Sequence, residues 1–277
     1  SPEFTPEQTT LTKVTSSGEF ITDVTISKEI FSQVSVDEQG NLVTLSQEGT
    51  NWVIRKWNSD LVVTQTLSVP IPLTFTQIQI HKSAYYLNLA EYNSQNLPTW
   101  KISKYGLDGK LMWTKPLKDY SIEGILALRF FGESDQFLLS KYSSESIRFA
   151  KVNGSTGEMI WGRSFPLTDF GGQYYFPRVY PLESGQLLVA SGGIQATNWS
   201  LINHRGSIYL QNEPDLPEEN LTYAGGNLIE EEDGGFLATF GVDWQVSAAN
   251  FKLIKLDTRL NAGWVGSFNL LVPGYVA

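Results

Sequence analysis

IRFAKVNGSTGEMIW, residues 147–161, is the stretch that decides the fold of this chain. An extended, largely apolar run ends near a lysine, a polar turn with glycine at position 157 follows, and a second extended run begins. Glycine readily adopts the positive φ that a tight hairpin turn needs. The stretch therefore predicts two neighbouring antiparallel strands joined by a short turn.

The first part of this pattern occurs six times along the chain. The copies are TTLTKV (9–14), WVIRKW (52–57), WKISKY (100–105), IRFAKV (147–152), WSLINH (199–204) and FKLIKL (251–256). Their fifth residues serve as markers: Lys13, Lys56, Lys104, Lys151, Asn203 and Lys255, spaced 43 to 52 residues apart. Repetition at this period in strand-forming sequence indicates a β-propeller, in which each repeat forms one blade.

Two more extended stretches precede each later marker phrase, for example FTQIQI at 75–80 and SAYYLNL at 83–89. The second of them is almost continuously apolar, as expected of a strand covered on both faces. Each repeat therefore holds four strands, the number in a propeller blade. Segments with helical periodicity and caps are missing, so the sequence predicts an all-β fold with almost no helix.

Five complete four-stranded repeats fit between about residue 28 and residue 270, whereas residues 9–26 supply only the last two strands of a repeat. We predict a six-bladed β-propeller of four-stranded antiparallel blades, whose last blade is shared between this N-terminal hairpin and the C-terminal stretch 270–277. Sharing a blade closes the ring and removes exposed sheet edges. Five blades plus an extra hairpin is the alternative.

Residues 5–277 are expected to form a single propeller domain, and residues 1–4, SPEF, resemble the remnant of a cloning vector. The chain contains no cysteine, which excludes disulfides, thiol nucleophiles and thiolate metal sites. No run approaches the roughly 20 apolar residues of a membrane-spanning helix. The net charge of −9 argues against a nucleic-acid partner, because phosphate binding requires clustered lysine and arginine.

Two hairpins, VNGSTGEMIW (152–161) and YGLDGKLMW (105–113), resemble the Asp-x-x-Gly-x-x-x-Trp hairpin of quinoprotein-type, or PQQ-like, propeller repeats. EEDGGFLATFG (231–241), followed by FKLIKLDTRLNAGW (251–264), is similar to repeats of predicted secreted bacterial propeller proteins, many of them surface or lipid-anchored. The resemblance implies an extracytoplasmic location, in the periplasm, at the cell surface or secreted. It also allows a lipid anchor on a removed N-terminus.

In that family the tryptophan that closes the hairpin docks between blades. Trp113, Trp161 and Trp264 match it, and Thr22, Thr64 and Leu210 stand at the places expected to be equivalent. We therefore expect the three tryptophans to be mostly buried at blade interfaces. The other three blades must dock through different contacts.

The sequence predicts no bound cofactor and no metal. Quinoprotein dehydrogenases of this type hold their quinone with calcium, acidic and amide ligands and often a vicinal cysteine pair, and no such set is recognisable here. The two histidines, His81 and His204, lie in different repeats, and His204 is interpreted as a packing residue. The acidic run at 230–233 lies beside a glycine turn and is interpreted as a solvated loop.

The recurring lysines admit two interpretations. A lysine stem can cover apolar surface while its head reaches water, which favours a structural role. The alternative is a functional ring of lysines that attracts an anion at one end of the channel.

Three connections that join a second strand to a third are longer than the turns around them, at 90–100, 191–199 and 241–250. They are expected to share one face of the ring. Their candidate ligand contacts are Tyr92, Asn96, Asn198, Asp243, Trp244 and Gln245. An aromatic face combined with amide groups suits a sugar or a peptide, bound by stacking and neutral hydrogen bonds with little dependence on salt.

The connections between blades, at 116–124, 166–176 and 212–226, are predicted to lie on the opposite face. The last of them is acidic through Asp215, Glu218 and Glu219, which is interpreted as an aid to solubility. The sequence thus favours a non-enzymatic extracytoplasmic module that binds a protein or glycan through loops on one face. The alternative is a carbohydrate-active hydrolase or lyase that uses carboxylates at the central channel, with Glu230, Glu231, Glu232 and Asp233 as candidates.

Overall fold

The computed structural model of the 277-residue chain describes residues 8–15, 17, 19–27, 31–48, 51–70, 75–92, 94–95, 98–122, 127–132, 134–170, 177–192, 197–212, 228–242 and 249–270. These residues form 22 strands and two short 3-10 helices, and no α-helix occurs among them. No helix of this part of the chain is long and apolar enough to cross a membrane. The all-β prediction is confirmed.

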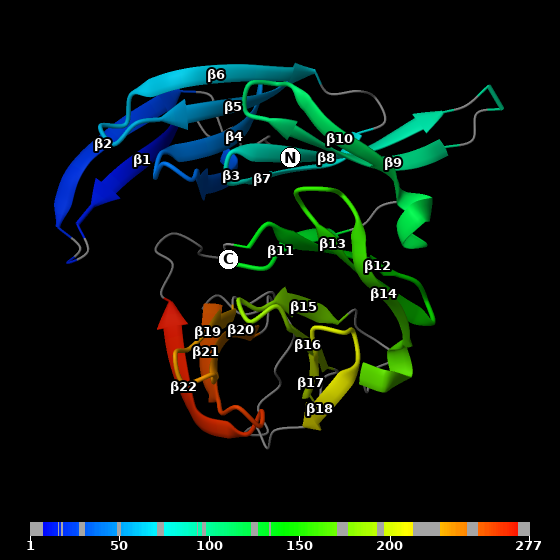
Figure 1. Ribbon diagram of the computed structural model, residues 1–277. Coiled ribbons are helices and arrows are strands. Elements are labelled where there is room, and N and C mark those ends of the chain that lie inside the picture. The colour runs from blue at the N-terminus through cyan, green and yellow to red at the C-terminus, as the bar shows by residue number, and fades with distance from the viewer. Residues whose placement is uncertain are drawn as a thin grey trace, which may run out of the picture. The chain divides into compact units, whose positions relative to one another are not determined.

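The chain divides into two compact units, residues 1–125 and 126–277, which are described separately. The first unit holds the hairpin β1 (Gln8–Val14)–β2 (Phe20–Ser27) and two four-stranded sheets (Figure 1). One sheet contains β3 (Phe31–Val36), β4 (Leu42–Glu48), β5 (Asn51–Trp57) and β6 (Val63–Pro70). The other contains β7 (Phe75–His81), β8 (Ala84–Tyr92), β9 (Pro98–Gly106) and β10 (Leu111–Pro116).

The second unit holds three four-stranded sheets (Figure 1). They are β11 (Ala127–Phe130), β12 (Gln136–Tyr142), β13 (Ser146–Asn153) and β14 (Met159–Pro166); β15 (Arg178–Pro181), β16 (Leu187–Gly192), β17 (Thr197–Ile202) and β18 (Ile208–Asn212); and β19 (Leu228–Glu230), β20 (Phe236–Val242), β21 (Ala249–Leu256) and β22 (Ala262–Leu270). Five four-stranded sheets and one two-stranded hairpin fit the predicted division into repeats. The C-terminal segment assigned to the shared blade lies almost wholly outside the described residues.

Every four-stranded sheet is an antiparallel meander in which neighbours in space are neighbours in sequence. The turns between strands one and two, and between strands three and four, therefore lie at one end of the sheet, here called the turn end. The connections between strands two and three lie at the other, here called the loop end. Because four antiparallel strands bring the chain back to the end where it entered, the connection to the next sheet also leaves from the loop end.

The prediction that the connections between blades lie opposite the long second-to-third-strand connections was therefore wrong. A hydrogen bond shows both kinds together: the N–H of Leu167, in the connection after β14, donates to the carbonyl of Glu145, between β12 and β13, at 2.9 Å. The loop end therefore carries both kinds of connection. The connections between second and third strands were predicted to be longer than the turns, which was wrong: they run over 49–50, 93–97, 143–145, 193–196 and 243–248 and are about as long as the turns, because the flanking strands extend further than expected.

The strand register puts five of the six marker residues at equivalent positions. Four of them lie in the third strand of a four-stranded sheet, and Lys13 lies in β1 of the hairpin. Each comes immediately before the place where the pairing with the following strand shifts by a bulge; the pairs opposite are Lys13 with Thr22, Lys56 with Gln65, Lys104 with Trp113, Lys151 with Trp161 and Lys255 with Trp264. In the fifth repeat this position is Leu201, paired with Leu210, and not the predicted Asn203. Likewise Gln65, and not Thr64, occupies the tryptophan position.

Asn203 instead closes the turn that follows. Its Oδ1 accepts hydrogen bonds from the backbone N–H groups of Arg205, at 2.9 Å, and Ser207, at 3.1 Å. Asn58 and Asp257 close the corresponding turns of their sheets in the same way. A side-chain oxygen that takes up two backbone N–H groups holds a tight turn closed, which explains why these positions are polar.

Neighbouring sheets within a unit pack through apolar faces. In the second unit, Leu138, Phe149 and Trp161 of one sheet join Leu187 and Val189 of the next in one buried cluster. Trp161 is 8% exposed, and a Cβ added at Gly206, in a turn of the neighbouring sheet, would lie only 2.8 Å from its Cε3 atom. The predicted docking of Trp161 between blades is confirmed.

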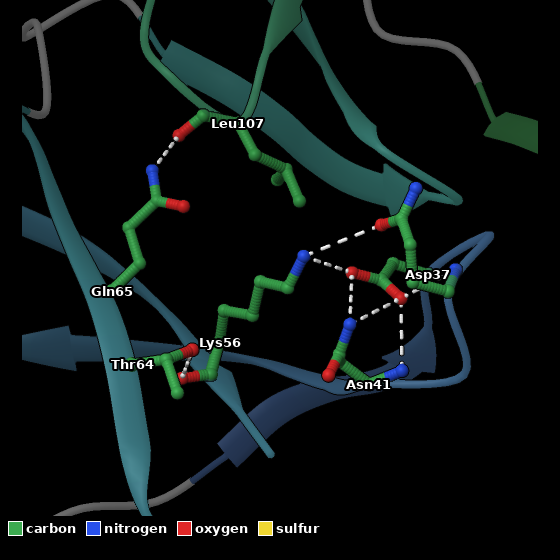
Figure 2. A network of polar contacts seen from close by, with 7 residues as sticks. Asp37, Asn41, Lys56, Thr64, Gln65 and Leu107 are labelled. Atoms are coloured by element: carbon green, nitrogen blue, oxygen red, sulfur yellow. Dashed lines mark hydrogen bonds and ion pairs between the residues drawn. The ribbon is translucent and has the colours of Figure 1, made fainter.

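The other docking positions behave differently. Trp113 is only half-buried and meets the Tyr86 ring edge-on, with centroids 6.0 Å apart. The side chain of Trp264 lies outside the described residues. Gln65, at the equivalent position, donates from Nε2 to the carbonyl of Leu107 in a turn of the neighbouring sheet, at 2.7 Å (Figure 2). A hydrogen bond thus replaces aromatic packing in that repeat.

The two 3-10 helices, η1 (Leu117–Tyr120) and η2 (Leu167–Phe170), follow Pro116 and Pro166. They form from the similar sequences PLKDY and PLTDF, which lie in segments predicted to be connections between blades. Tyr120 and Phe170 are almost completely buried. These short helices therefore turn an aromatic side chain into the core where the chain leaves a sheet.

Candidate functional site

The predicted loop residues are only partly covered by the structure. Tyr92 ends β8 at the loop end of its sheet, and its side chain is 53% exposed. Asn198 lies at the loop end of β17, half-buried, opposite Ser191 of β16. These two residues belong to different units. Asn96, Asp243, Trp244 and Gln245 lie outside the described residues, so their grouping into a site stays a prediction.

The turn end of the first four-stranded sheet contains a closed polar network (Figure 2). Nζ of Lys56 lies 2.5 Å from Oδ2 of Asp37 and donates to Oε1 of Gln39 at 3.3 Å. Oδ1 of Asp37 also accepts backbone N–H groups of Gln39, at 2.9 Å, and Asn41, at 2.8 Å. Burial alone would raise the pKa of Asp37, but Lys56 and the bonds from Asn41 and Gln39 outweigh it, so the pKa of Asp37 is lowered.

The other marker lysines are also engaged by the protein itself. Lys255 pairs with Glu231 at 2.8 Å, and Lys151 donates to the carbonyl of Gly185 at 2.8 Å while lying over the ring of Phe131. Lys104 lies over the ring of Tyr86, with 5.4 Å between Nζ and the ring centroid. These contacts support the structural interpretation of the lysines, because each ammonium already has a partner within the protein.

The acidic run proposed for an enzyme is likewise engaged. Oε2 of Glu230 accepts the backbone N–H of Glu183 at 2.9 Å, and Glu231 binds Lys255. Among the residues that the structure describes, no group of three or more histidine, cysteine, aspartate or glutamate side chains is placed to hold a metal ion. His204 is exposed on a turn, so its prediction as a packing residue was wrong.

Two arginines that no sequence motif marks lie on the first strands of two neighbouring sheets in the second unit. Arg129 belongs to β11 and Arg178 to β15, and these strands approach each other. The hydroxyl of Tyr142, at the loop end of β12, donates to the carbonyl of Pro177 at 2.6 Å. This bond ties the loop end of one sheet to the residue just before Arg178.

Charge and burial oppose each other in this cluster. Burial raises the pKa of both Tyr142 and Tyr180, while the positive charges of Arg129 and Arg178 lower it in part. Both arginines thus contribute to the pKa of both phenols. The only sequence signal is an arginine in consecutive first strands, in LALRFFG (126–132) and FPRVYPL (176–182).

Comparisons with known proteins identify the fold and no family. No protein-family model matches the sequence, and no curated protein matches it. A protein of unknown function from Bacteroides caccae is 11% identical, with a TM-score of 0.50 over 95% of this chain and 94% of that one. Dihydro-heme d1 dehydrogenase NirN is 11% identical, with a TM-score of 0.52 over 92% of this chain. The Dos1 propeller is 12% identical, with a TM-score of 0.47 over 87% of this chain.

The chain is a β-propeller. Its repeated four-stranded antiparallel meanders establish this fold. It spans 49% of the NirN chain and 63% of the Dos1 chain, and identities near 11% relate the folds alone. The activity of those proteins is therefore not transferred to this one.

Proposed function

We propose that the protein is a non-enzymatic interaction module of the extracytoplasmic space, which binds a protein or glycan through the loop ends of its sheets. The observation that carries this proposal is the difference between the two ends. The turns at the turn end are at most five residues long, whereas three of the connections between sheets, which leave from the loop end, span ten residues or more, at 117–126, 167–177 and 213–227. Binding residues concentrate on long loops held by a rigid scaffold.

The polar groups of the turn end support this assignment. The charged groups of Asp37, Glu231 and Lys151 form ion pairs or hydrogen bonds with neighbouring strands and turns. At the loop end, Tyr92 presents half of its surface to solvent. An exposed aromatic ring beside amide groups suits a sugar or peptide ligand.

The alternative, a carbohydrate-active hydrolase or lyase, needs two carboxylates free to act as acid and base. Glu230 and Glu231 are bound to Glu183 and Lys255, which favours the binding module over the enzyme. The similarity of the repeats to secreted bacterial propellers supports the extracytoplasmic location.

A glycan array and a panel of purified envelope proteins, probed with the whole chain, test the proposal. Tyr92→Ala and Trp244→Ala each remove an aromatic group assigned to the loop end. For any ligand found, at least one of them is expected to weaken binding by about tenfold or more, as truncation of aromatic anchors does. Tyr209→Ala is the matched control, because Tyr209 is 51% exposed but lies near the turn end of its sheet.

Wild type and Tyr209→Ala are expected to bind with equal affinity, and both are expected to bind more tightly than the loop-end variants. A ligand lost in Tyr209→Ala but kept in both loop-end variants would place binding at the turn end and contradict the proposal. Turnover of a bound glycan would favour the enzyme instead.

A further inference from the structure

Two valines of β3 are exposed where other sheets bury the corresponding residues. The register places Val34 and Val36 on either side of the β3 residue that is level with the recurring lysine, as it places Ile78 and Ile80 in β7. Ile78 and Ile80 are buried, whereas Val34 and Val36 are 52% and 57% exposed. The residues at the position of Val34 in the following two sheets are buried as well, namely Leu128 and Val179.

This exposure follows from the neighbouring hairpin β1–β2, which supplies only the counterparts of a third and a fourth strand. Nζ of Lys13 donates to the carbonyl of Ser59 at 2.8 Å, so the hairpin contacts the turn that follows β5, the third strand of its neighbour. Across that sheet Val36 is level with Trp57 of β5, and Trp57 is buried although Val36 is exposed. The third strand of this face is therefore covered, and the first strand is open.

β1 also has an edge that no described strand occupies. In every four-stranded sheet the third strand pairs on both sides, whereas β1 pairs with β2 alone in the part of the chain that the structure describes. An unpaired edge of N–H and C=O groups is a template for a further strand. In the neighbouring sheet the second strand, β4, contributes Val43 and Leu45 to the buried cluster that includes the counterparts of the two exposed valines. A strand paired with β1 is therefore expected to cover these valines in the same way.

We propose that the open edge of β1, together with Val34 and Val36, binds an extended segment of a partner protein as an added antiparallel strand. The backbone of β1 selects a polypeptide, because only an extended chain offers N–H and C=O groups at the spacing of a strand. The two valines select apolar side chains at alternate positions of that segment. The site continues the interface between the hairpin and the β3–β6 sheet, and it does not depend on the ligand proposed for the loop ends.

A peptide copy of β4 is the probe, because that strand already covers the counterparts of the two valines. It consists of residues 41–48, NLVTLSQE, with a fluorescent label. Fluorescence anisotropy with the whole chain is expected to show saturable binding that changes little between about 50 and about 200 mM NaCl, since no ion pair is involved. Thr44→Pro in the peptide is the matched control and is expected to abolish binding, because proline removes a backbone N–H from the ladder.

Variants of the protein test the apolar floor of the site. Val34→Asp and Val36→Asp are each expected to weaken peptide binding by about tenfold or more, because the added strand would strip water from the carboxylate. Val62→Asp is the control, since Val62 is 56% exposed but lies in the turn between β5 and β6. All three positions are exposed, so the urea midpoint of each variant is expected to match that of wild type. Equal affinity of wild type and Val34→Asp would overturn the proposal, as would the lack of saturable binding.

Amide hydrogen exchange tests the pairing with β1. Addition of the peptide is expected to slow exchange within Gln8–Val14 by about tenfold or more, and to leave exchange in β6 unchanged. Peptide binding without added protection of β1 would overturn the assignment of the edge.

Two other occupants are distinguishable by the same variants. A peptide of residues 270–277 that displaces the β4 peptide and is weakened equally by Val34→Asp would assign the edge to the C-terminal stretch of this chain. Sedimentation that shows dimers of wild type but monomers of Val34→Asp would assign it to a second copy. Either result would replace the partner protein and overturn the proposal.

Discussion

The ammonium of Lys56 lies 2.5 Å from the carboxylate of Asp37, whose side chain is completely buried while that of Lys56 is 24% exposed. This pair joins the third strand of the sheet to the turn between the first and second strands (Figure 2). Lys255 and Glu231 repeat the same relationship in the last sheet at 2.8 Å, with both partners more exposed. In these two sheets the recurring lysine links the third strand to the turn end of its own sheet, whereas Lys151 reaches Gly185 in a turn of the next sheet.

Removing one partner of this pair leaves a charge without its counterion. Asp37→Ala is expected to lower the free energy of unfolding by about 3 kcal/mol, because a mostly buried charge loses its partner and several backbone N–H groups lose their acceptor. Urea denaturation measures this. Asp108→Ala is the control, because its ion pair with Lys110 is exposed on both sides and is expected to contribute little to stability. Equal losses in the two variants would contradict the assigned role of the buried pair.

The pair also predicts a dependence on pH. The pKa of Asp37 is lower in the folded protein than its usual value of 3.8, so its contribution is fully present above that value and is lost as the pH falls through the folded pKa. The difference in unfolding free energy between wild type and Asp37→Asn should therefore be constant from pH 5 to 7. It should begin to shrink at about pH 4 and should shrink further as the pH is lowered below that value. A difference that grows on acidification would mean that the carboxylate is destabilised in the fold.

Trp161 and Trp113 occupy the same position in consecutive repeats but differ in burial. Trp161→Ala is expected to cost about 3–5 kcal/mol, because it empties a packed site between two sheets. Trp113→Ala is expected to cost less, since that ring is only half-buried. Ile160→Ala, beside Trp161 but 46% exposed, is the control. Melting of Trp161→Ala close to that of Ile160→Ala would remove the argument that this ring docks the sheets.

The corrected register of the fifth repeat is testable through Asn203 and its neighbour. Asn203→Ala is expected to destabilise the protein by about 1–2 kcal/mol, because two backbone N–H groups lose their acceptor. His204→Ala is expected to be neutral, as His204 is exposed. Leu201→Ala should cost about 2–5 kcal/mol as a large-to-small change in the core. A neutral Leu201→Ala would argue against its place at the lysine position.

The repeat pattern predicted the strands well because a strand is a local structure. Alternation, β-branched residues and turn glycines are legible within ten residues, and a period near 48 residues repeats the same local choices. The predicted register was wrong in the fifth repeat, which has no lysine in its marker phrase. WSLINH in the fifth repeat carries polar Asn203 two residues beyond the true position, and a slip of two keeps the same side of the strand, so alternation could not expose it.

The candidate site was less accessible from sequence. Tyr92, predicted to lie in a long connection, instead ends β8, with its side chain 53% exposed. The face assigned to the connections between sheets was wrong, because the chain reverses direction at each of the four strands and so leaves a sheet at the end where it entered. Arg129 and Arg178 are 49 residues apart and carry no motif. Their strands become neighbours only in the folded protein, where β11, the first strand of one sheet, approaches β15, the first strand of the next.

By itself, the sequence determined that this protein is built from four-stranded repeats, since strand propensity, turn chemistry and period all act over short distances along the chain. Only the tertiary structure decided which partner each charged group finds. Lys56 and Asp37 are separated by 19 residues, and Tyr142 and Pro177 by 35. Contacts of this kind depend on register and on the packing of one sheet against another. The local sequence pattern of a strand contains no information about either, so these contacts could not be predicted from it.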